Sequence, residues 1–108
     1  MDAAAPGDRV AAFVRLIGET PQDPVLRFGL GNALYAAERF EEAAAAYREA
    51  VRLDSAYSAA HKQLGRALLK AQRGPEARAA FTEGLAVARA KGDLQTAREI
   101  ETWLKQLG

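Results

Sequence analysis

Residues 30–34 read LGNAL and residues 64–68 read LGRAL. These two stretches lie 34 positions apart, and the same interval separates the segments rich in small residues that follow them, at 43–50 and 77–84. Self-similarity at a fixed spacing of this length indicates a stack of repeated helical units. We therefore expect a helical repeat protein.

The two copies place small and large residues at matching positions. Two helices that pack at short distance need small residues where their backbones meet. The residues that supply this room are Gly31, Ala43, Ala50, Gly65, Ala77 and Gly84. Tyr47 and Phe81 are the large side chains that fill the remaining space, so we expect both rings to be buried.

The pattern resembles the tetratricopeptide repeat (TPR) family, whose unit is a 34-residue helix–turn–helix. The residues that carry the resemblance are Leu30, Gly31, Leu34, Ala43, Tyr47 and Ala50, and then Leu64, Gly65, Leu68, Ala77, Phe81 and Gly84. Arg27 and His61 depart from the family's usual Trp, and Ser55 and Arg89 from its usual Pro. The resemblance implies an all-α fold, a right-handed α-solenoid of antiparallel helix pairs.

Helix signals divide the chain into a single TPR-like domain, 1–108, with about six helices. Residues 1–7 are expected to be a frayed tail, and the first helix to run from Arg9 to Ile17 with Asp8 as its cap and Gly18 at its end. Later boundaries are indicated by Asp23-Pro24, Asp54-Ser55, Gly74-Pro75 and Gly92-Asp93. The expected units are a half-repeat helix at 8–21, repeats at 24–57 and 58–91, and a capping helix at 93–107.

Composition excludes several classes of protein. The 15 basic and 14 acidic residues leave a net charge of +1, which gives no general attraction to nucleic acid or anionic lipid. Cysteine is absent, so disulfides and thiolate metal sites are excluded. No apolar run approaches the ~18 residues of a membrane span, and the N-terminus lacks a secretory pattern. We expect a cytoplasmic protein that needs no cofactor.

The resemblance also implies a binding groove, because the first helix of each repeat lines the concave face in this family. The candidate groove residues are Phe28, Asn32, Tyr35, Lys62, Arg66, Leu69 and Lys70. Lys62, Arg66 and Lys70 are spaced i, i+4, i+8, which places three cations on one side of one helix. We call them the basic stripe and expect it to attract an acidic or C-terminal peptide.

A plainer interpretation stays open for the same residues. A Lys/Arg stripe at helical spacing is commonly a solvated face, and Phe28 or Tyr35 can pack against a neighbouring helix. Some relatives carry a two-carboxylate clamp for chaperone C-termini. Here Asn32 matches that clamp, but Phe28 replaces its Lys, Gln63 replaces an Asn and the third repeat is missing, so the clamp is not expected.

The remaining polar and aromatic residues suggest no chemistry. His61 occupies a packing position, and Trp103 is expected to pack within the capping helix. Glu41-Glu42 and Glu99 with Glu101 are expected to be ordinary exposed carboxylates. No set of nucleophile, base and orienting group can be assembled, so we predict no catalytic residue, no metal site and no enzyme activity.

We therefore predict a protein–protein interaction module, an adaptor or scaffold whose partner is another protein or peptide. The alternative is a self-associating structural module that forms a homo-oligomer through helices at the solenoid ends.

Overall fold

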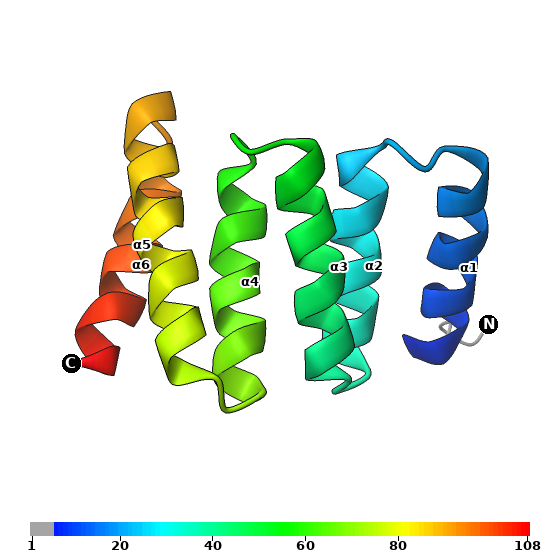
Figure 1. Cartoon of the computed structure of the whole chain (residues 1–108), viewed down its shortest axis with the longest axis horizontal. Coiled ribbons are helices and arrows are strands. Elements are labelled where there is room, and N and C mark those ends of the chain that lie inside the picture. Colours follow the sequence, from blue (N-terminus) through cyan, green and yellow to red (C-terminus); the bar gives the residue numbers. More distant parts are fainter. Residues whose placement is uncertain (1–5) are drawn as a thin grey trace.

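The computed structural model describes residues 6–108, and over this range the chain forms six α-helices and no strand, as predicted (Figure 1). The helices are α1 (Pro6–Glu19), α2 (Pro24–Ala36), α3 (Phe40–Leu53), α4 (Ser58–Lys70), α5 (Gly74–Lys91) and α6 (Leu94–Leu107). In Figure 1 the helices follow one another along the long axis of the molecule, from α1 at one end to α5 and α6, which overlap in this view, at the other. Each helix packs against the next one along the chain, and the contacts of α2 with α3 and of α4 with α5 are the most extensive. The all-α solenoid is therefore confirmed.

Polar caps and a glycine set several boundaries where the sequence indicated them. Asp23 caps α2 by accepting a hydrogen bond from the Val25 backbone N–H at 2.8 Å. Asp93 caps α6 by accepting from the Thr96 N–H at 3.3 Å, after Gly92 has ended α5 with φ 74°. These groups satisfy backbone donors and acceptors that a helix end leaves open.

The expected first helix was too short. In the structure α1 begins at Pro6 and ends at Glu19, so Asp8 lies within the first turn and Gly18 lies within the helix. The Thr20 N–H still donates to the Leu16 carbonyl at 3.0 Å, which continues the helical hydrogen bonding past Gly18. The expected tail at 1–7 is therefore wrong at its last two residues, and positions 1–5 lie outside the described residues.

The core follows the repeat, as the spacing predicted. Tyr47 and Phe81 are 0% exposed. A Cβ added to Gly31 would lie 2.5 Å from the Tyr47 ring, and a Cβ added to Gly65 would lie 2.5 Å from the Phe81 ring. Neither position can hold a larger residue without moving a buried ring, so glycine is required at both.

Candidate peptide-binding site

Three helices meet at Arg66, the central residue of the basic stripe. Its Cζ lies 5.5 Å from the ring centroid of Tyr35 on α2 and 5.4 Å from that of Trp103 on α6. A guanidinium within about 6 Å of an aromatic face is attracted by the ring quadrupole. Tyr35, Arg66 and Trp103 therefore form one layer across α2, α4 and α6, which we call the central layer.

The polar atoms of Arg66 are only partly used. Its Nη1 donates to Gln63 Oε1 at 3.0 Å, and its Nε is buried without a hydrogen-bond partner. No carboxylate within residues 6–108 forms an ion pair with this side chain. The central layer therefore holds a positive charge in a fixed orientation and leaves that charge without an anion.

Lys62 differs from Arg66 because the chain already supplies its anion. Lys62 Nζ donates to Glu99 Oε2 of α6 at 2.7 Å, and the Lys62 side chain is only 18% exposed. The hydrogen bond from Lys62 holds the pKa of the Glu99 carboxyl below its usual value. Glu99 is exposed over 40% of its side chain, as expected, but it is not isolated, because its ion pair with Lys62 joins α6 to α4.

Lys70, at the end of the stripe, is exposed and forms no ion pair within the described residues. Leu69 beside it is half-buried and packs against the core. The basic stripe thus holds one paired cation, one that is stacked between aromatic rings and one that is free.

On α2 the structure separates the candidate residues by role. The Phe28 ring lies 5.7 Å from that of Tyr47 and 5.0 Å from that of Tyr57, so Phe28 packs between helices. Asn32 is exposed, and its Oδ1 accepts a hydrogen bond of 2.6 Å from the Tyr47 hydroxyl. Burial raises the pKa of Tyr47 to about 12. Asn32 therefore orients a buried phenol while its own amide N–H groups stay available.

Tyr35 is half-buried and also meets Phe40, at 5.1 Å in an edge-to-face arrangement. Of the candidate residues, the structure therefore brings Tyr35 and Arg66 together, with Trp103 beside them. Asn32 instead contacts Tyr47, Lys62 contacts Glu99, and Phe28 packs between Tyr47 and Tyr57. The sequence missed Glu99 and the second role of Trp103, which stacks on Phe81 at 6.0 Å as well as on Arg66. Glu99 and Trp103 are spaced i, i+4, so the sequence already indicated that they share one face of a helix.

His61 is 1% exposed, and its Nε2 lies 3.0 Å from the Ser55 carbonyl oxygen, so its packing role is confirmed. Among the described residues, no three His, Cys, Asp or Glu side chains are grouped so as to hold a metal ion. Within the same part of the chain, no helix is long and apolar enough to cross a membrane.

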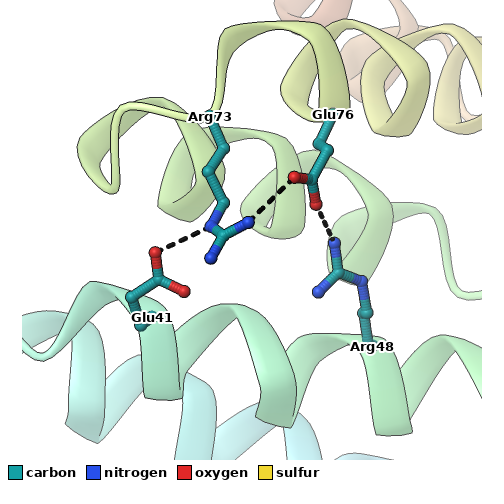
Figure 2. A network of polar contacts seen from close by, with 4 residues as sticks. All are labelled: Glu41, Arg48, Arg73 and Glu76. Atoms are coloured by element: carbon teal, nitrogen blue, oxygen red, sulfur yellow. Dashed lines mark hydrogen bonds and ion pairs between the residues drawn. The ribbon is translucent and has the colours of Figure 1, made fainter.

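A second polar arrangement joins α3 to the start of α5. Arg73 Nε donates to Glu41 at 2.7 Å and Arg73 Nη1 donates to Glu76 at 3.0 Å, while Arg48 Nη2 donates to Glu76 at 2.8 Å. Figure 2 shows these four side chains in one chain of contacts, which we call the α3–α5 network. All four are exposed to solvent by roughly half, so salt screens them and each pair contributes modestly.

Two shallow hollows repeat at the 34-residue interval, away from the basic stripe. The larger, about 320 Å³, is lined by α2 and α3, and the smaller, about 230 Å³, by α4 and α5 together with Arg48. Six lining residues of the first hollow each have a counterpart 34 positions later in the second, for example Leu30 with Leu64 and Glu42 with Glu76. Neither of these two hollows is lined by a candidate site residue.

The chain is similar in sequence to known repeat proteins. A family model described as a TPR repeat matches residues 31–72. A TPR repeat-containing protein of Pseudomonas aeruginosa is 36% identical over 98 residues, which cover 91% of this chain and 93% of that protein. A protein of Bordetella parapertussis with a known solution structure is 31% identical, with a TM-score of 0.79 over 99% of this chain and 89% of that one.

Two further solved structures share the fold at lower identity. The type III secretion translocator chaperone SycD of Yersinia enterocolitica has a TM-score of 0.88 at 16% identity, over 94% of this chain and 71% of that one. PcrH, solved in complex with the chaperone-binding region of PopD, has a TM-score of 0.89 at 18% identity, over 94% and 77%.

Proposed function

Because this chain belongs to the tetratricopeptide repeat family, we propose that it is a protein-interaction module that binds a short segment of another protein along α2, α4 and α6. The observation that carries the proposal is the central layer, in which Tyr35, Arg66 and Trp103 come from three separate helices. A cation held between two rings and lacking an anion is suited to an acidic ligand, because it loses little side-chain freedom on binding.

The solved neighbours support binding over catalysis. PcrH was solved with the chaperone-binding region of PopD, so one protein with this fold holds a segment of another protein, and SycD is named as a translocator chaperone. In our proposal the ligand lies on the side of the solenoid that presents Asn32, Tyr35 and Arg66, where amide, aromatic and cationic groups are within reach of one extended chain.

The test is a paired capture experiment from lysate of the source cells. The site variant is Arg66→Gln with Lys70→Gln, and the matched control is Arg9→Gln with Arg15→Gln on α1, which removes the same charge from exposed arginines. We expect proteins captured by wild type and by the control to be lost from the site variant, with all three proteins equally helical by circular dichroism. Equal capture by both variants would place any binding elsewhere.

A second candidate, self-association, is favoured by the exposed aliphatic side chains near the N-terminal end. Val14 is 56% exposed, Leu16 40% and Val25 61%. If these residues form an interface, light scattering should show a mass that rises with protein concentration. Val14→Glu with Leu16→Glu should abolish the rise, whereas Leu94→Glu, at a comparably exposed position on α6, should not. A constant monomer mass rejects this candidate.

A further inference from the structure

From the spacing and pairing of the basic stripe we infer, resting on the proposed function, that the ligand is an extended segment with acidic side chains at alternate positions. The segment lies along α4, and its first carboxylate takes the place that Glu99 occupies in the free protein. Glu99 of the chain itself therefore competes with this acidic ligand for Lys62.

Helix geometry sets the spacing of the basic stripe. Residues four apart on an α-helix are separated by about 6 Å along its axis. Lys62, Arg66 and Lys70 therefore present three cations at intervals of about 6 Å on α4. In an extended chain, residues two apart are separated by about 6.6 Å and point to the same side. Carboxylates at alternate positions can thus each meet one cation, whereas adjacent carboxylates point to opposite sides and cannot.

The pairing of the three cations supports the same class of ligand. Arg66 and Lys70 have no carboxylate partner within residues 6–108, so two of the three positions are open to an anion. The third cation, Lys62, shows what the stripe accepts, because the chain places the Glu99 carboxylate on it at 2.7 Å. Charge complementarity with an acidic segment is therefore already visible once within the molecule.

The exposures of Lys62 and Glu99 allow a carboxylate of the ligand to replace that of Glu99. The Lys62 side chain is 18% exposed and held by its surroundings, whereas the Glu99 side chain is 40% exposed. A carboxylate of similar length can replace Glu99 without moving α6, since α6 is attached through the buried Ile100 and through Trp103, which stacks on Phe81. Glu99 therefore competes with the ligand, and its removal should strengthen binding.

The test uses two peptides of identical composition that differ only in spacing: N-acetylated, C-amidated Glu-Ser-Glu-Ser-Glu and Glu-Glu-Ser-Ser-Glu. Binding is followed through the indole N–H signal of Trp103 in NMR titrations, because this is the single tryptophan of the chain and it stacks on Arg66. We expect the alternating peptide to bind about two- to fivefold more tightly, the range of one exposed ion pair. Equal dissociation constants for the two peptides would overturn the inference.

A matched pair of variants tests the role of Glu99. Glu99→Gln removes the carboxylate that pairs with Lys62, and Glu101→Gln removes the neighbouring carboxylate that pairs with Arg89 at 2.9 Å. Both changes add one unit of net charge. We expect Glu99→Gln alone to tighten binding of the alternating peptide by about two- to fivefold. An equal gain in both variants would reflect net charge only and would overturn the competing role of Glu99.

The outcomes separate this inference from the proposed function. If the capture experiment succeeds but neither peptide shifts the Trp103 signal at millimolar concentration, the site binds protein segments and the alternating acidic class is wrong. If Arg66→Gln with Lys70→Gln leaves capture unchanged, the proposed function itself fails, whatever the peptides do.

Discussion

The junction of α1 with α2 and the junction of α3 with α4 have the same place in the repeat. They differ in how completely the aromatic ring of the first helix is buried. Phe13 and Tyr47 lie 34 positions apart, on α1 and α3. Tyr47 is 0% exposed and lies against Gly31 in its own helix pair. Phe13 has no earlier partner helix among the described residues, so it lies against Gly29 of α2 and stays partly exposed.

The ion pairs differ in the same direction. Arg48 and Glu41 on α3 connect that helix to Glu76 and Arg73 of the next unit. The positions 34 residues before Arg48 and Glu41 hold Val14 and Gly7, which carry no charge. The N-terminal unit therefore lacks both the full burial of its aromatic ring and the charges that join one unit to the next, so α1 should be the less firmly held helix.

The largest expected effect compares two rings of the repeat. Phe81→Ala should lower the free energy of unfolding by about 3–5 kcal/mol, because the ring is 0% exposed and fills space beside Gly65. Phe13→Ala should cost roughly half as much, since that ring is already partly in water. Urea unfolding followed by circular dichroism measures both. Equal losses of unfolding free energy would mean that the partial exposure of Phe13 does not reduce its contribution to stability.

Sequence reasoning reached the packing of the repeats because that packing depends on residue size at a fixed interval. Gly31 with Tyr47, and Gly65 with Phe81, could be paired from spacing alone. The turns were harder to predict. Glu38 and Gln72 adopt φ of 61° and 62° at equivalent positions, although neither is a glycine or asparagine, the residues that favour this conformation.

The candidate site could be predicted only in part, because α6 departs from the repeat. The helix before it, α5, has 18 residues, whereas α3, its counterpart one repeat earlier, has 14. After this longer α5, α6 begins at Leu94, which is 36 positions after the start of α4, so the 34-residue interval could not show which acidic residue faces Lys62. The stripe itself was visible as an i, i+4, i+8 pattern, but its pairing with Glu99 required the structure.

A second prediction uses the hydroxyl that distinguishes Tyr47 from Phe13. Burial raises the pKa of Tyr47 from 10.0 to about 12 in the folded protein, so the unfolded chain loses this proton first. The stabilising contribution is complete below pH 10 and is lost as the pH rises toward 12. At 1.36 kcal/mol per pKa unit, the loss reaches roughly 2–3 kcal/mol.

Unfolding free energies measured in urea between pH 9 and pH 12 test this prediction. The control is Tyr47→Phe, which keeps the ring and removes the titrating hydroxyl. It also gives α3 the same residue type that α1 has at Phe13. Its stability should fall less steeply over the same range. A residual slope is expected from Tyr57, whose pKa burial also raises. Identical slopes for wild type and Tyr47→Phe would show that the phenol of Tyr47 is not protected by folding.

The smallest expected effect comes from giving α1 the kind of ion pair that α3 forms with α5. Val14 corresponds to Arg48, and Glu42 to Glu76, so Val14→Arg should let α1 pair with α3 as α3 pairs with α5. Glu76 accepts from Arg73 and Arg48 together, which shows that a carboxylate at this position serves two guanidinium groups. Within residues 6–108, Glu42 accepts side-chain hydrogen bonds only from Arg39.

Val14→Arg should therefore raise the melting temperature slightly and slow amide hydrogen exchange in α1, and both gains should shrink in 1 M salt because the pair is exposed. Val14→Gln is the control for removing an exposed aliphatic side chain. The reciprocal change, Arg48→Val, should lower the melting temperature at low salt and make the α3–α5 contact resemble that of α1 with α3. If Val14→Arg and Val14→Gln behave alike at every salt concentration, the missing charge at position 14 does not account for any difference in stability between α1 and α3.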